Sequence, residues 1–206
     1  MTDNFHSMHT LPLSQFFERV PHTDWFLRQP PSDMHGLGHT ARVMVWAAVL
    51  ARGTPWLSQA VWAAACHDLR RQDDGRDRDH GPRASEWIDQ HLTPIYPLPA
   101  DFLEPVSQAV RWHCIPDPLI EWDHPLVRIL KDADGLDRVR LWDLNPDYLR
   151  LPGSRDWIPY AEQLYCQSEF IQSPVEIFCV AVHILPDLGL QERCIDTFVD
   201  GAKPLV

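Results

Sequence analysis

The residues best suited to catalysis are an adjacent pair, His67 and Asp68, at the end of a segment that is otherwise apolar over residues 56–65. If this segment is a helix, His67 follows Ala60 by seven positions and Ala64 by three, so its imidazole shares the apolar face. Burying an imidazole and a carboxylate is costly without a compensating partner, and a metal ion is one such partner. A His-Asp pair that only caps a helix C-terminus is the alternative for this dipeptide.

Other segments repeat this pattern of a ligand-type side chain on an apolar face. Asp134 lies four residues after Leu130 on the stripe of a predicted helix, which directs its carboxylate toward the core. His113 extends the apolar stripe that ends at Val110, and His39 opens a further helix with an apolar face. A lone histidine in such a place is usually a hydrogen-bonded core residue, so the repetition carries the prediction that helix ends converge on one site.

The predicted ligands are two imidazoles and two carboxylates: His39, His67, Asp68 and Asp134. This mixed set suits Mn, Fe, Co, Ni or Zn better than Ca. Four protein ligands leave room for water on an octahedral ion, and water acidified by the cation can attack an in-line phosphorus. Helix-face reasoning favours Asp134 over Asp132 and Asp137, which stay open as alternatives.

The elements that must position these residues are helices, because apolar residues recur at helical spacing and the period-2 alternation of strands is missing. We predict an all-α fold, with Pro55, Pro82, Pro125 and Pro174 in or near first turns. Two stretches, 69–81 and 141–157, are predicted loops, and the first would deliver its charges to the site. The predicted helices span residues 13–20, 39–52, 56–68, 82–92, 100–113, 125–140, 158–172, 174–185 and 188–199.

Composition limits the class of protein. The chain has 206 residues, 45% of them hydrophobic and 23% charged, which predicts one packed domain over residues 1–206. A net charge of -11 argues against duplex nucleic acid as a partner, although a bound cation would still hold an anionic substrate. There is no apolar run of about 18 residues, so no membrane span is expected. Five cysteines without a Cys-x-x-Cys pair suggest reduced, mostly buried thiols and a cytoplasmic protein.

The motifs in this order resemble the HD-domain superfamily of metal-dependent phosphohydrolases, whose pattern is His, then His-Asp, then Asp on successive helices. Residues 39–43 (His-Thr-Ala-Arg-Val) resemble its first metal-binding helix, residues 66–69 (Cys-His-Asp-Leu) its signature pair, and residues 131–137 (Lys-Asp-Ala-Asp-Gly-Leu-Asp) the segment with the last ligand. The resemblance covers residues 35–140. It implies a single-domain helical bundle with helices 158–200 packed on this core.

The resemblance also allows a second metal. Members with two metals add histidines between the pair and the last Asp, and His80 and His113 occupy suitable places in that order. For each, the alternative role is contact with a ligand residue or with substrate. The paired histidines of cyclic-dinucleotide phosphodiesterases are absent because Cys114 follows His113, which argues against that branch.

Cations near these motifs are candidates for binding substrate phosphate, because a guanidinium matches phosphate oxygens bidentately. We select Arg42, Arg83 and Lys131, with a solvated surface position as the alternative for each. His35, one turn before His39, is predicted to orient a ligand or to assist protonation of a leaving group. His35 and Asp68 are the candidate catalytic residues.

The leading functional hypothesis is hydrolysis of a nucleotide or another small phosphorylated metabolite by a metal-activated water. A di-iron oxygenase is the alternative from another reaction class, and it needs His80 and His113 as ligands. A silent module that binds a nucleotide without turnover is the third. The helices from Ile158 onward are expected to support packing and to offer a homo-oligomer interface.

Overall fold

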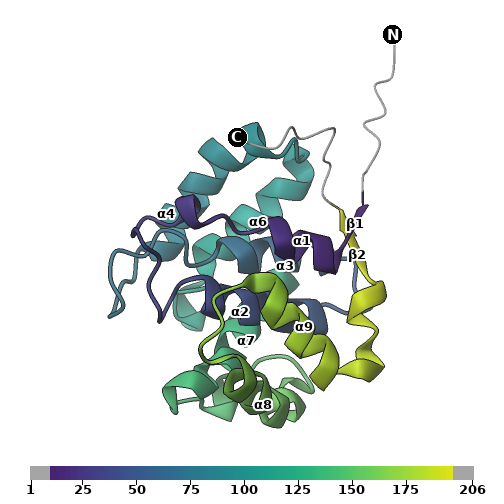
Figure 1. The fold of residues 1–206 in the computed structure, drawn as a ribbon. Helices are drawn as coiled ribbons and strands as arrows, with labels where there is room; N and C mark the ends of the chain where they lie inside the picture. Colours follow the sequence, from purple (N-terminus) through teal and green to yellow (C-terminus); the bar gives the residue numbers. More distant parts are fainter. Residues whose placement is uncertain (1–9, 197–206) are drawn as a thin grey trace.

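Two helices, α2 (Leu37–Leu50) and α3 (Leu57–Cys66), lie at the centre of the fold (Figure 1). The structure is a computed structural model that describes residues 10–196. Both helices are rich in Ala and Val, and nearly all of their residues are buried. Since a helix that is apolar on every side must be covered on every side, the remaining helices serve as that cover.

Three helices pack directly on this central pair: α6 (Ala100–Trp112), α7 (Pro125–Asp137) and α9 (Pro174–Ile184). An outer set packs on these. Helix α4 (His80–Trp87) lies on α6 and continues through a π-helical turn, Ile88–Leu92, into α5 (Thr93–Ile95). Helices α1 (Leu13–Arg19) and α8 (Ile158–Ser168) both pack on α9.

The prediction of an all-α fold is confirmed, and the predicted segments from 13–20 through 174–185 each contain an α-helix. The helix predicted over 188–199 is wrong for the residues that the structure describes. There Gly189 takes a left-handed conformation (φ 57), Leu190–Glu192 forms one 3-10 turn, and β2 (Cys194–Asp196) pairs antiparallel with β1 (Thr10–Pro12). Pairing with β1 satisfies the backbone groups of this segment without a helix. Residues 197–199 lie outside the described part.

The loop over residues 69–79 projects to the left of the bundle in Figure 1. Its Asp74 is tied to the segment before α2, since Ser32 Oγ donates to Asp74 at 2.5 Å and Arg28 pairs with it at 2.7 Å. At its end, Gly81 allows α4 to approach α6 closely, because a Cβ there would lie 2.7 Å from the carbonyl oxygen of Val110. The glycine thereby brings the start of α4 next to the end of α6.

Thiol burial differs from the expectation. Cys66 is buried, Cys114 is half-buried, and Cys166, Cys179 and Cys194 are exposed, so the prediction of mostly buried thiols is wrong. Three of the five lie on the outward side of late elements, where sequence spacing gave no burial signal. Within residues 10–196, no single helix combines the length and apolar character needed to cross a bilayer; α9 and the turns after it reach them only as a pair bent by 96°.

Candidate metal centre

The candidate ligands come from the ends of helices that meet at one place. His39 is in the first turn of α2, and His67 and Asp68 follow the last residue of α3. Two further imidazoles and a carboxylate come from α4, α6 and α7, namely His80 at the start of α4, His113 just after α6, and Asp134 in the last turn of α7. The convergence predicted from the apolar stripes is therefore what the fold produces.

A first cluster joins His39, His67, Asp68 and Asp134. The Nε2 atoms of His39 and His67 are 3.1 Å apart, and His39 Nε2 is 3.5 Å from Asp134 Oδ1. Asp68 Oδ2 lies 3.4 Å from His39 Nε2 and 3.7 Å from His67 Nε2. Donor atoms of His39, His67 and Asp134 all lie within 4.8 Å of one another, so one cation can contact them together.

A second cluster joins His80 and His113 to the other oxygen of Asp68. The Nε2 atoms of the two imidazoles are 2.9 Å apart. Asp68 Oδ1 lies 3.1 Å from His80 Nε2 and 3.9 Å from His113 Nε2. The two oxygens of one buried carboxylate thus face two different pairs of histidines, an arrangement in which Asp68 can bridge two cations.

The proton positions on these four imidazoles favour a cation. In each ring Nδ1 faces an oxygen that can only accept, so Nδ1 carries the proton in the neutral form and Nε2 keeps a lone pair. Two lone pairs that face each other cannot satisfy each other, whereas a cation between them accepts both. The acceptors are Asp137 Oδ2 for His39 (2.7 Å), Ala64 O for His67 (2.7 Å), Val110 O for His113 (2.6 Å) and Asp77 O for His80.

The titration of the metal-free cluster is consistent with ligands that exchange protons for metal. Burial lowers the pKa of His67 to about 4, which leaves this ring neutral at pH 7. Burial acts to lower the pKa values of His39 and His80 too, but hydrogen bonds to carboxylates outweigh burial and raise both pKa values. Asp68 is buried as well, yet the charge that His67 carries at low pH and hydrogen bonds from three other imidazoles hold the pKa of Asp68 well below its usual range. A cation would replace the protons held by His39 and His80.

The structure separates the three carboxylates that competed for the last ligand position. Asp134 lines the cavity that opens over the two clusters, and 36% of its side chain is exposed. Asp137 is buried behind His39 and receives hydrogen bonds from Arg42 Nε at 2.6 Å and Arg140 Nε at 3.0 Å. Asp132 is also buried, and it accepts from the backbone N–H groups of residues 150 and 151 and from a serine hydroxyl. Of the three, Asp134 lies on the Nε2 side of His39 at 3.5 Å, whereas Asp137 lies on its Nδ1 side.

His35 lies beside the clusters, in the segment before α2. Its Nδ1 is 2.9 Å from Asp68 Oδ2, and its ring meets the ring of His39 edge-on at 5.4 Å between centroids. Burial lowers its pKa, and this outweighs the hydrogen bond to Asp68, so the ring is mostly neutral at pH 7. His35 also lines the pocket, so its ring contacts Asp68 and the space that is open to a substrate.

The three cations selected from the sequence for substrate binding do not line this pocket. Arg42 is buried in its ion pair with Asp137, because α2 turns that side chain into the interface with α7. Arg83 is engaged by Asp77 and by the carbonyl oxygen of residue 70. Lys131 pairs with Asp117 at 2.6 Å in a different hollow. Each therefore already has a carboxylate partner that does not line the pocket.

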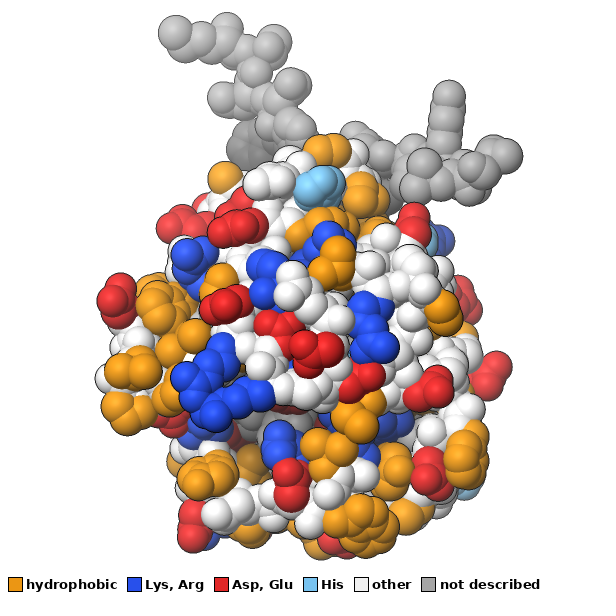
Figure 2. Space-filling model, turned by 90° about the vertical axis from the view of Figure 1, so that its left-hand side faces the viewer, with side chains coloured by type: hydrophobic (Ala, Val, Ile, Leu, Met, Phe, Trp, Pro, Cys, Tyr) orange, Lys and Arg blue, Asp and Glu red, His pale blue; other side chains and the backbone are white. Residues whose placement is uncertain are grey.

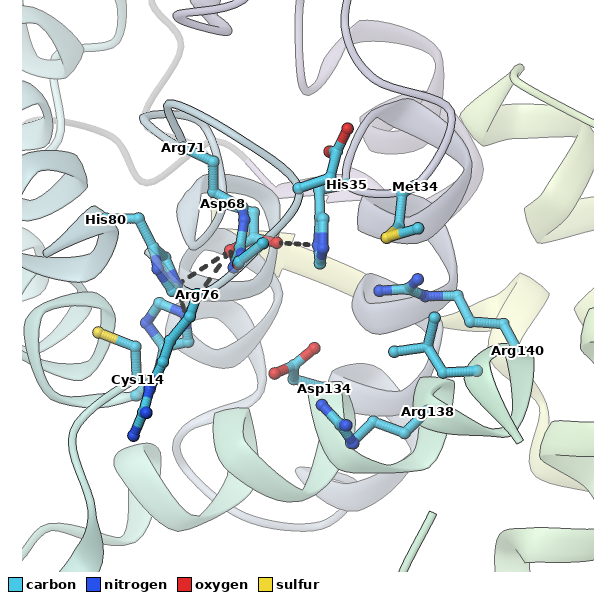
Figure 3. A pocket seen from close by; sticks show the side chains of 14 residues that line it. Met34, His35, Asp68, Arg71, Arg76, His80, Cys114, Asp134, Arg138 and Arg140 are labelled. Atoms are coloured by element: carbon cyan, nitrogen blue, oxygen red, sulfur yellow. Dashed lines mark hydrogen bonds and ion pairs between the residues drawn. The ribbon is translucent and has the colours of Figure 1, made fainter. Parts of the chain in front are cut away.

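Other arginines take their place. A cavity of about 440 Å³ opens over the clusters, and four arginines line it: Arg71, Arg76, Arg138 and Arg140. Figure 3 shows the side chains of Arg138 and Arg140 on the side of Asp134 opposite Asp68 and His80. On the face that carries the loop 69–79, basic side chains are spread over the middle of the view with carboxylates between them (Figure 2). Arg71 had a signal in the sequence, since it follows the signature pair, whereas Arg138 and Arg140 had none beyond their place after the last ligand.

Comparisons with known proteins identify the family and the fold. The family model for the HD domain matches residues 36–139, half of the chain. A crystal structure described as a predicted HD superfamily hydrolase from an uncultured Thermotogales bacterium aligns with a TM-score of 0.55 and 24% identity, covering 76% of this chain and 94% of that one, and it shows a shared fold. A search of curated proteins finds no match. The chain belongs to the HD domain family of metal-dependent hydrolases.

Proposed function

We propose that this chain is a phosphohydrolase that removes phosphate from a small phosphorylated metabolite, using one or two divalent transition metals. The observation that carries the proposal is the pair of facing imidazole couples, His39 with His67 and His80 with His113, on either side of Asp68. Arginines around the same cavity supply the charge that a phosphate group requires.

The first cluster, with Asp134, would hold one cation, and the second would share Asp68 with another. Bound there, the metal would acidify water and neutralise charge that develops on the phosphoryl oxygens. Asp137 keeps His39 in the tautomer that offers Nε2, because its carboxylate accepts a hydrogen bond from Nδ1–H. The neutral ring of His35 donates from Nδ1 to Asp68, so its Nε2 is left to accept a proton from water and to return it to the leaving-group oxygen.

The partners and location follow the sequence-based expectations. The formal charge of -11 favours a small-molecule substrate over duplex nucleic acid. The five unpaired thiols fit a reducing compartment, and we place the protein in the cytoplasm on that basis.

The direct test is phosphate release from a panel of nucleotides and sugar phosphates in the presence of Mn²⁺, Co²⁺ or Ni²⁺. His67→Ala removes a ligand that is fully buried between both clusters, and it is expected to abolish turnover. His183→Ala, at an exposed position on α9, is the matched control and should leave turnover unchanged. Inactivity across the whole panel with every metal would contradict the proposal, and turnover would exclude a silent binding module.

A di-iron oxygenase is the second candidate, because six side chains that could serve as the ligands of this chemistry lie in the two clusters. It requires iron in both clusters and consumption of oxygen. The two activities separate in one experiment on the purified protein, with phosphate release measured under nitrogen with Mn²⁺ and oxygen uptake measured with Fe²⁺. Phosphate release without oxygen supports the hydrolase, and oxygen uptake that needs an added organic substrate supports the oxygenase.

A further inference from the structure

Arginines stand on two walls of the pocket. Arg71 belongs to the loop 69–79, while Arg138 and Arg140 belong to the 3-10 turn η4 (Arg138–Leu141) that follows α7. Arg71 is held by the carbonyl oxygen of Gly75 at 2.7 Å, and its NH1 lies 3.6 Å from Asp68 Oδ1. The side chains of Arg71 and Arg140 are mostly buried, with 13% and 8% of them exposed. Their guanidinium groups are fixed in place before any substrate arrives.

The carboxylates of the pocket do not cancel this charge. Asp68 and Asp134 face the imidazole donors and would be matched by the cations bound there. Asp74 is already paired with Arg28 at 2.7 Å and accepts from Ser32. Arg140 uses Nε for Asp137 and keeps its terminal nitrogens for the pocket. Arg138 pairs with Asp143, and Arg140 shares Asp137 with Arg42, so the four arginines of the lining still carry positive charge for a second anionic group.

The described lining offers no Phe, Tyr or Trp ring on which a nucleobase could stack, and its three imidazoles hydrogen-bond to Asp68 or belong to the candidate ligand clusters. Among the described residues that form the pocket there is no Phe, Tyr or Trp, and the apolar ones are Met34 and Leu141. Trp142 follows η4 directly, but it is 88% exposed and lines a separate hollow beside α8. Proteins that bind bases usually stack them on aromatic rings. The cavity of about 440 Å³ does not by itself exclude a nucleoside; the absence of Phe, Tyr and Trp from its described lining is what argues against a base.

We propose that the pocket selects a compact substrate with two anionic groups and no nucleobase. This inference rests on the proposed function, because one of the two groups is the phosphate to be hydrolysed. That group binds at the metal centre beside Arg71, which reaches toward Asp68. The second anionic group, a phosphate or a carboxylate, binds on the opposite wall to Arg138 and Arg140. The proposed substrates are thus sugar or polyol bisphosphates, and comparable phosphate esters that carry a second anionic group, in place of nucleotides.

Two matched pairs of substrates test the two parts of the inference with Mn²⁺ as the metal. Fructose 6-phosphate and fructose 1,6-bisphosphate differ by the second anionic group, and we expect kcat/KM to rise about tenfold with it, the effect of one charge-assisted hydrogen bond. Ribose 5-phosphate and AMP differ by the base, and we expect no gain from the base. A gain of tenfold or more for AMP, or equal values for the fructose pair, would overturn the inference while phosphate release itself upholds the hydrolase.

Arg138→Gln assigns the second anionic group to its wall. This side chain is 47% exposed and pairs with Asp143 outside the ligand clusters, so the fold should tolerate the change. The KM for the bisphosphate should rise about tenfold, whereas the value for the monophosphate should change less than about threefold. Arg155→Gln, an exposed arginine paired with Asp147 away from the pocket, is the control and should alter neither. An equal rise for both substrates in Arg138→Gln would overturn the assignment.

Discussion

Replacing Asp137 by Asn should weaken both the fold and the metal site, because this carboxylate serves both. Burial acts to raise its pKa, but the charge of Arg42 and the hydrogen bond from His39 outweigh burial and lower it from 3.8 to about 2. A shift of that size corresponds to roughly 2 kcal/mol of stability at pH 7. This contribution is complete above about pH 4 and is lost as the pH falls through the lowered pKa of about 2.

The variant also leaves Arg42 buried without its charge partner, at 4% exposure. Breaking a buried ion pair from one side costs about 3–5 kcal/mol, so we expect the free energy of unfolding to fall by about 3 kcal/mol or more. Urea denaturation of the metal-free protein, followed by the fluorescence of its nine tryptophans, measures this loss. Calorimetric titration with Mn²⁺ should show affinity reduced about 10- to 100-fold, because His39 loses the partner that fixes its tautomer.

Asp147→Asn is the control, since Asp147 pairs with Arg155 on the surface with 80% of its side chain exposed. It should change stability by less than about 1 kcal/mol. The reasoning is refuted if Asp137→Asn is as stable as this control and binds Mn²⁺ with unchanged affinity.

Three further outcomes follow from the same contacts. Asp132→Asn should lower the free energy of unfolding by about 2 kcal/mol and leave Mn²⁺ affinity unchanged, since Asp132 accepts hydrogen bonds from several donors in residues 150–154. Asp134→Asn should instead weaken Mn²⁺ binding and leave stability nearly unchanged. An equal loss of Mn²⁺ affinity in both variants would contradict the ligand assignment. Gly81→Ala should cost about 1–3 kcal/mol in urea denaturation because its Cβ would meet Val110 O at 2.7 Å, and native-like stability would show that α4 and α6 are not so closely packed. As the pH falls from 6.5 to 4, the free energy of unfolding of the metal-free protein should fall by about 3 kcal/mol more than that of His67→Gln. The reason is that burial lowers the pKa of His67 to about 4, so the neutral ring stabilises the fold above pH 6.5 and this contribution is lost as the pH falls. Parallel pH profiles for the two proteins would show that His67 is not buried in its neutral form.

Local pattern was enough to predict most of the helices and the meeting of the candidate ligands at one place. The apolar stripes that put His67, His113 and Asp134 on inward faces depend only on helical spacing, and the fold brings these residues together. The same reasoning failed at residues 188–199, where apolar spacing resembled a helix but pairing with β1, a segment far away in the sequence, decides the conformation.

The substrate cations could not be predicted in this way. Arg42 and Lys131 lie in the motifs that carry the candidate ligands, but each forms an ion pair with a carboxylate elsewhere in the fold. Arg42 pairs with Asp137, and Lys131 pairs with Asp117. Which partner an arginine finds depends on tertiary contacts that spacing along one helix does not encode. Arg138 and Arg140 reach the pocket because α7 ends at Asp137 and continues as a tighter turn, which changes the faces on which the next residues lie.

The central claim is that Asp68 stands between two cation sites, and anomalous diffraction from crystals grown with Mn²⁺ tests it most directly. We expect two peaks about 3.5–4 Å apart, one beside His39, His67 and Asp134 and the other beside His80 and His113, each within bonding distance of one oxygen of Asp68. A map without a peak within about 3 Å of the Asp68 carboxylate, at saturating Mn²⁺, would contradict the account.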